Sequence, residues 1–244
     1  MTKTKIFGEE FRHQFLDENG FANIIDYGEE LKRLRFFIEE IERFISKSET
    51  DEINILTEST TELSEDQKAD FWMWHYPIHW RDVFGIRIRQ SFCILLCSHI
   101  ETLLSDISHR IQIIERQEFG IDDLYGRSIR NKAKLYFRRL ADFQAPSSER
   151  WKEIDYIFQL RNKFVHSNGF LGDISDKNFE SFLKTVSSDG LAYGFIELKY
   201  ESASTFLNIV DNFQTSLLSE YDKYRQKHLE KDTNKDSPGT DVSQ

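Results

Sequence analysis

The clearest pattern in the first third of the chain is a run of apolar residues at helical spacing. Through residues 22–46 they recur three or four positions apart, which predicts an amphipathic helix with its charges facing outward. Residues 47–67 lose this period and are acidic and rich in Ser and Thr, so we expect an exposed loop there. An autoinhibitory mimic of RNA is a less favoured interpretation of the same acidic residues. The aromatic run at 71–80 contains Pro77, which predicts a break in the helix.

A second apolar stretch, residues 86–117, predicts a helix at the centre of a bundle, because its middle is apolar nearly all round. Capping signals, Ser at the start and Asn168-Gly169 at the end, indicate a later helix over about 149–167. The remaining expected elements are a turn at 119–123, a basic helix over 128–143, a short helix at 176–187, a short strand or hairpin arm at 195–200 and a last helix over 202–224.

Composition agrees with an all-α fold. Only 3 Pro and 11 Gly occur in 244 residues, and hydrophobic residues make up 39%, enough for a packed core. We expect a helical extension with an acidic loop over 1–77, a helical bundle of four to five core helices over 78–224 with a short β segment before the last helix, and a disordered tail over 225–244.

No run approaches 18 consecutive apolar residues, and the N-terminus lacks the pattern of a signal peptide, so a cytoplasmic protein without a membrane span is expected. Cys93 and Cys97 lie in one apolar run and are expected to be buried, reduced thiols. His75 and His79 suggest metal ligands, but Pro77 interrupts their helical spacing and no third ligand lies nearby. We therefore favour packing for both, and expect no metal and no cofactor.

The charge is unevenly distributed. The chain carries a formal net charge of −10, which argues against broad binding of nucleic acid. Residues 127–163 nevertheless hold ten Lys and Arg against four acids. This local excess provides candidate contacts for RNA phosphates, for which we select Arg130, Lys134, Arg138 and Lys163.

The helix over 149–167 departs from its own pattern at Arg161. On a helical projection this guanidinium lies in the middle of an apolar arc. Burial of the charge there is costly unless the guanidinium is paired, solvated or placed at an interface that has a function. A structural ion pair is the simplest alternative to a functional role.

Asn162 and His166 lie four residues apart on a polar stripe of the same helix, close enough to interact. His166 falls in the last turn, where an imidazole can act as a helix cap. It can also exchange protons near neutral pH, as a general acid or base does.

The segment 161–166 resembles the Arg-Asn-x-x-x-His signature of the HEPN superfamily (higher eukaryotes and prokaryotes nucleotide-binding domain). The helix at 151–160 looks like the one that leads into this motif in the family. Residues 94–104, with Glu101 ahead of two leucines, are similar to its earlier core helix. The resemblance covers roughly residues 78–222 and leaves 1–77 unexplained.

The resemblance implies a helical bundle that dimerises and brings two Arg/His motifs into one cleft. Active members are metal-independent endoribonucleases of toxin–antitoxin, antiviral and other conflict systems, which use the ribose 2′-hydroxyl to attack the adjacent phosphate. In this chain His166 would be the general acid or base, Arg161 would bind the phosphate, and Asn162 would orient His166 or contact a phosphate oxygen. Glu101 would hold Arg161 or His166 in place.

The expected partners are an RNA substrate, a second copy of the chain and an antitoxin or other defence-system protein. On the helix Arg161 and His166 project about 140° apart, so one helix alone makes a poor site and the projection predicts that the site requires a dimer with two facing helices. Some related toxins carry a modified Tyr where this chain has Asn168, so neutralisation by that route is not expected. The alternatives are a non-catalytic HEPN-like module that binds RNA, a nucleotide or a protein, and an unrelated helical protein with a structural Arg/His pair.

Overall fold

A computed structural model describes residues 27–126, 128–140, 143–144, 146–172, 176–187 and 194–235. Its elements are α2 (Tyr27–Ser59), α3 (Glu65–His75), the π-helical segment η1 (His79–Gly85), α4 (Ile86–Ile114), the 3-10 turn η2 (Ile121–Asp123), α5 (Ile129–Arg139), α6 (Ser148–Ser167), α7 (Lys177–Val186) and α8 (Ser202–Lys235). The all-α class is therefore confirmed. In the described residues the expected strand at 195–200 is reduced to two isolated bridges, Phe170 with Phe195 and Ser187 with Leu198.

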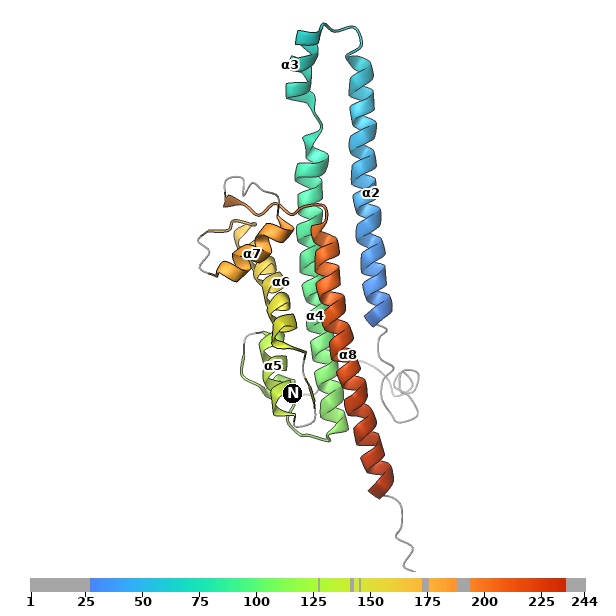
Figure 1. Cartoon of the computed structure of the whole chain (residues 1–244), viewed down its shortest axis with the longest axis vertical. Coiled ribbons are helices and arrows are strands. Elements are labelled where there is room, and N and C mark those ends of the chain that lie inside the picture. Colours follow the sequence, from blue (N-terminus) through green and yellow to red (C-terminus); the bar gives the residue numbers. More distant parts are fainter. Residues whose placement is uncertain are drawn as a thin grey trace, which may run out of the picture.

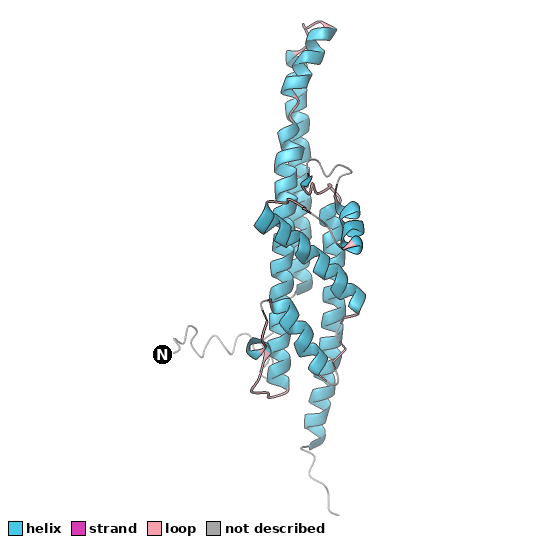
Figure 2. Ribbon diagram, turned by 90° about the vertical axis from the view of Figure 1, so that its left-hand side faces the viewer, coloured by secondary structure: helices cyan, strands magenta, loops and turns pink. Residues whose placement is uncertain are grey.

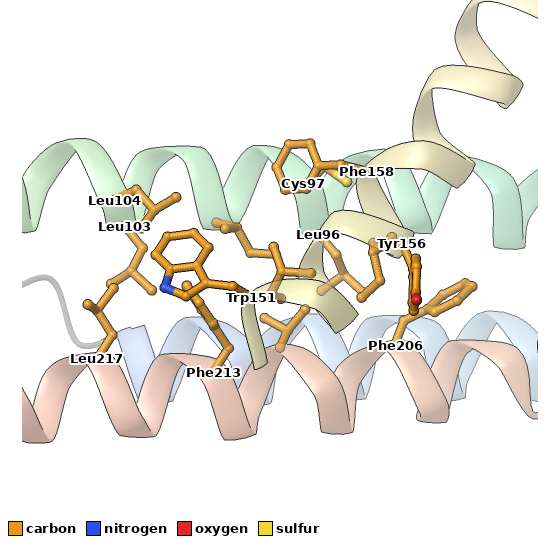
Figure 3. Packing of buried hydrophobic residues seen from close by; sticks show 14 of the residues in the cluster. Leu96, Cys97, Leu103, Leu104, Trp151, Tyr156, Phe158, Phe206, Phe213 and Leu217 are labelled. Atoms are coloured by element: carbon orange, nitrogen blue, oxygen red, sulfur yellow. The ribbon is translucent and has the colours of Figure 1, made fainter. Parts of the chain in front are cut away.

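The helices α2, α4 and α8 are long and run side by side (Figure 1). The shorter α5, α6 and α7 form a layer against α4 and α8, and Figure 2 looks onto that layer. The two layers share one hydrophobic core, in which Trp151 of α6 packs edge-on against Phe213 of α8 with ring centroids 4.7 Å apart (Figure 3).

Helix α4 is the central helix that its apolar pattern predicts. Its side chains Leu96, Ile100 and Leu103 are fully buried between the two layers. The helical stretch that ends in α4 is long and apolar enough to cross a membrane, but half of its most apolar window is buried inside the protein. Cys93 and Cys97 are buried free thiols, as expected, and burial raises the pKa of Cys93 well above its ordinary value.

The expectation of an exposed loop over 47–67 is wrong except at residues 60–64, which form a turn between two helices. Helix α2 continues without interruption to Ser59. Hydroxyl groups in this part bond to the helix itself, since Thr50 Oγ1 donates to the carbonyl of Ser46 (2.9 Å) and Thr57 Oγ1 to that of Ile53 (2.7 Å). The Ser- and Thr-rich composition was therefore a poor indicator of a loop, because these side chains also satisfy helical carbonyls.

Other helix and domain boundaries also differ from those expected from the sequence. Helix α5 ends at Arg139 rather than near 143, where residues 141 and 142 lie outside the described part. The tail expected from 225 is helical as far as Lys235, and residues 236–244 are not described. The expected extension is not separate from the bundle, because Tyr27, Leu31 and Ile38 of α2 belong to the same core as α4 and α8. Residues 22–26 of the first predicted helix lie outside the described residues.

At the end of α6 the backbone is left-handed at two successive residues, the C-cap Asn168 (φ +50°) and Gly169 (φ +83°). The amide of Gly169 donates to the carbonyl of Lys163 (2.9 Å) and closes the last turn. A Cβ here would also approach Gln90 Nε2 to 3.3 Å. We expect Gly169→Ala to lower the free energy of unfolding by about 1–2 kcal/mol, measured by urea denaturation. Ser167→Ala, at the exposed last residue of α6, is the control, and an equal loss in both variants would contradict this account.

The hydroxyl of Tyr136 in α5 is buried and has no hydrogen-bond partner within the described part of the chain. Burial, and then the charge of Glu115, raise its pKa from 10.0 to about 12. The raised pKa contributes stability that is present below pH 10 and lost as the pH rises through about 12. Between pH 10 and about 12 the free energy of unfolding of Tyr136→Phe is therefore expected to fall less than that of the wild type. Urea titrations at a series of pH values measure this difference. Tyr125→Phe, at a fully exposed position, should follow the wild type; a matching slope for Tyr136→Phe would refute the prediction.

Candidate active site between α4, α5 and α6

An open groove with a volume of about 1110 Å³ lies between α4, α5 and α6. Five of the eight residues selected from the sequence line it: Glu101, Arg130, Arg161, Asn162 and His166. The other lining residues are Thr102, Ser105, Asp106 and His109 of α4, Ser128 and Ile129 at the start of α5, and Phe158 of α6. Residues far apart in the sequence thus meet along one surface.

Helix α6 is held so that its polar edge faces the groove. Ser147 caps its N-terminus by accepting a hydrogen bond from the amide of Arg150 (3.4 Å). Its apolar side, including Ile154, Ile157 and Leu160, is fully buried. The burial of these side chains fixes the rotation of the helix about its axis. Arg161 is half-buried at the edge of this apolar side, and Asn162 and His166 are exposed.

Arg161 forms a hydrogen bond with a side-chain amide and not the ion pair that a structural role would need. Its Nη1 donates to Oδ1 of Asn162 (3.1 Å), and no carboxylate pairs with it in the described structure. Asn162 is therefore turned toward Arg161 instead of His166. The guanidinium keeps most of its donors available to a ligand in the groove. Its place in the apolar arc is explained by a position at the rim of the groove, where it is only half-buried.

Glu101 and His166 lie on the walls of the groove. In the described residues neither forms a side-chain hydrogen bond with the other or with Arg161, so the expected role of Glu101 as a direct holder of either residue is not realised in this structure. The arrangement presents a carboxylate, a guanidinium and an imidazole to the same space. These are groups that can accept a proton, bind a phosphate and exchange a proton, respectively.

His109 also lines the groove, and sequence reasoning missed it. Its Nε2 lies 3.0 Å from Oδ2 of Asp122 and its Nδ1 lies 3.4 Å from Oγ of Ser105. The signal was its spacing, because Glu101, Ser105 and His109 follow one another at intervals of four on one helix face. His109 lies about 12 Å along α4 from Glu101.

The two histidines lie at opposite ends of the groove. Helices α4 and α6 run in opposite directions, and Arg87 Nη1 at the start of α4 donates to Oδ1 of Asn168 after the end of α6 (2.9 Å). His166 therefore lies toward the end of the groove that is nearer the start of α4, whereas His109 lies toward the end of α4. Within one chain, His166 and His109 do not form a pair on either side of a single phosphate.

The other basic residues selected from the sequence are used differently. Arg130 Nε lies 3.0 Å from Oδ1 of Asp155, and Lys134 Nζ lies 2.7 Å from Oδ2 of the same carboxylate. Lys163 Nζ donates to the carbonyl of Leu171 (2.5 Å) and supports the loop after α6. Arg138 is exposed on α5. Of these four, Arg130 alone lines the groove, and Lys134, Arg138 and Lys163 lie outside its lining.

His75 has a ring contact, and His79 has a carboxylate partner. The His75 ring lies 4.5 Å from that of Phe71, and His79 Nε2 lies 3.3 Å from Glu52 Oε2. In the part of the chain that the structure describes, no group of three or more His, Cys, Asp or Glu side chains is placed to hold a metal ion.

Comparison of the chain with family models, with curated proteins and with solved structures finds no match.

Proposed function

We propose that the chain is a metal-independent endoribonuclease of the toxin or antiviral-defence type, acting in the cytoplasm. The observation that carries this proposal is the meeting of Arg161, Asn162, His166 and Glu101 on one groove that is open to solvent. Four residues from two helices that are distant in sequence share this surface, and their chemistry matches the needs of phosphate-ester cleavage.

In the proposed reaction His166 removes the proton of a ribose 2′-hydroxyl, and the oxygen attacks the adjacent phosphorus. The bond from phosphorus to the 5′-oxygen breaks, leaving a 2′,3′-cyclic phosphate. The departing oxygen takes a proton from water to become a 5′-hydroxyl, and the hydroxide so formed takes back the proton held by His166. Arg161 offers two N–H donors to the phosphoryl oxygens as negative charge accumulates on them. Asn162 orients Arg161 through the hydrogen bond between them, and Glu101 contributes a carboxylate to the same groove.

A homodimer is part of the proposal. Because Arg161 and His166 line the same groove in one chain, their separation on the helical projection does not by itself require two chains. A second chain would instead close the open groove and supply a second imidazole. Leu95 of α4 is 42% exposed and Val165 of α6 is 47% exposed, and each lies one or two helical turns from a groove residue. They are suitable apolar contacts for a second copy.

The alternative is a non-catalytic HEPN-like module that binds RNA, a nucleotide or a protein in the same groove. One observation favours it: in the described residues His166 has no hydrogen-bonded group that fixes its orientation, as a catalytic base normally has.

The test is incubation of the purified full-length protein with tRNA and with generic RNA in the presence of EDTA, with the oligomeric state measured in parallel by sedimentation. We expect cleavage by a dimer. Binding of RNA without cleavage would support the module, and neither binding nor cleavage would contradict the proposal.

A further inference from the structure

Residues 46–85, here called the arm, form a helical hairpin that extends beyond the end of the bundle. The arm comprises the second half of α2, all of α3 and η1, and in Figure 1 it projects past α7 and the start of α8. It lies apart from the groove, whose lining includes no arm residue.

The arm exposes large apolar side chains at an unusual density. Trp74 is 81% exposed, Met73 72% and Ile55 67%. Ile78, Val83 and Phe84 are each about half exposed. Exposed apolar surface gathered in one place on a protein commonly marks an interaction site, whereas scattered residues do not.

Helix α3 is the most exposed part of the arm. Within the described structure none of its side chains is buried, although it contains Phe71, Trp72, Met73 and Trp74. Its N-terminus is stabilised by a capping box between Ser64 and Gln67. A helix of 11 residues has little stability without packing. The cap stabilises this helix, and a contact that buried Met73 and Trp74 would stabilise it further.

The arm is strongly acidic. It holds Lys47, Lys68 and Arg81 against nine carboxylates, a formal net charge of −6: Glu49, Asp51, Glu52, Glu58, Glu62, Glu65, Asp66, Asp70 and Asp82. Two of the three cations are already paired within the arm, Lys68 with Glu65 (2.8 Å) and Arg81 with Asp82 (3.0 Å). This charge repels RNA, anionic membranes and the arm of a second copy, and it attracts a cationic surface. Base stacking on these aromatic residues is disfavoured for the same reason.

Part of the apolar surface is held rigid. Trp80 Nε1 donates to Oε2 of Glu52 (2.6 Å), which ties η1 to α2. The ring of Trp80 lies 5.3 Å from that of Phe84 and 6.0 Å from that of Phe44. Side chains that are already ordered lose less entropy when a partner binds. The cluster can therefore bind a partner without prior rearrangement.

We propose that the arm is a docking surface for a partner protein that presents a cationic amphipathic helix. The apolar face of that helix packs on Met73, Trp74 and the half-exposed side chains of η1, and its Lys and Arg side chains meet the carboxylates of the arm. The proposal does not depend on the nuclease activity, because the arm and the groove share no residue.

The test uses the full-length protein and a labelled synthetic amphipathic helix with Leu on one face and Lys on the other. A second peptide with the same Leu face and Glu in place of Lys is the charge control. Fluorescence anisotropy at physiological salt is expected to show binding of the Lys peptide and none of the Glu peptide. Trp74→Ala should weaken binding by about tenfold, with an unchanged circular dichroism spectrum because the side chain is largely exposed.

Tyr125→Ala is the matched control, because that side chain is fully exposed outside the arm, and it should bind the Lys peptide as the wild type does. The double variant Glu62→Lys/Asp66→Lys should weaken binding most at low salt. Several results would overturn the proposal: no binding by the wild type, equal binding of both peptides, or no change in Trp74→Ala. The proposal would also be overturned if Trp74→Ala lost self-association, binding to RNA or binding to anionic vesicles. Each of these results would show that the surface binds a different partner.

Discussion

Arg161→Ala is expected to lower the rate of RNA cleavage by about a thousandfold while leaving the protein folded. The guanidinium is half-buried at the rim of the groove, and its side-chain partner in the described structure is Asn162. Its removal therefore breaks no ion pair that holds helices together. The loss should appear in the rate at saturating RNA, because the bidentate contact strengthens as charge builds up on the phosphate.

His166→Ala is expected to reduce cleavage to a similar extent, because proton transfer by a side chain contributes about a hundredfold to ten-thousandfold. Loss of both side chains should cost little more than either single loss, since the two act in one step. The control is Arg139→Ala, an exposed guanidinium at the end of α5 outside the groove lining, which should cleave at close to the wild-type rate. Thermal melts that fall along with activity would instead indicate a structural role for Arg161 and His166.

Arg89→Met is expected to lower the free energy of unfolding by about 3–5 kcal/mol. The Arg89 and Glu42 side chains are 6% and 5% exposed, and they form a bidentate ion pair of 2.6 Å and 2.7 Å. Arg89 also donates to the carbonyl of Leu198 (3.2 Å), so it connects α2, α4 and the segment before α8. The substitution leaves the Glu42 carboxylate buried without its partner.

Urea denaturation of Arg89→Met and of the double variant Arg89→Met/Glu42→Leu measures this effect. The double variant should recover much of the loss, because an apolar pair of similar size needs no partner. Lys223→Ala, which removes a largely exposed partner of Glu220, is expected to stay within about 1 kcal/mol of the wild type. If Arg89→Met were as stable as Lys223→Ala, the stabilising role of the buried ion pair between Arg89 and Glu42 would be contradicted.

Helices with a strong apolar period were predictable from the sequence. The burial of α4 and the limits of α6 follow from apolar spacing and capping residues, and the structure confirms both. The continuation of α2 through residues 47–59 was not predictable from composition, because it depends on hydroxyl groups bonding within the helix and on the contact between Glu52 and Trp80. These interactions appear only once the helix and its neighbour are in place.

The candidate site was predictable in part. The motif on α6 and Glu101 on α4 could be selected separately, but their meeting in one groove depends on the antiparallel packing of the two helices. The contact between Arg161 and Asn162 was not expected, because adjacent residues on a helix do not normally face each other. His109 was missed because no motif contains it, and its contact with Asp122 depends on the turn at η2.

The most direct test of the groove as a ribonuclease site is cleavage of an oligonucleotide that contains one ribonucleotide within DNA, with EDTA present. The proposed attack by the 2′-hydroxyl predicts a single cut after the ribonucleotide, a 2′,3′-cyclic phosphate on one product and a 5′-hydroxyl on the other. The same products should be absent with Arg161→Ala and with His166→Ala. Cleavage at DNA positions, cleavage that persists in both variants, or no cleavage of this or any RNA by the wild-type protein would contradict it.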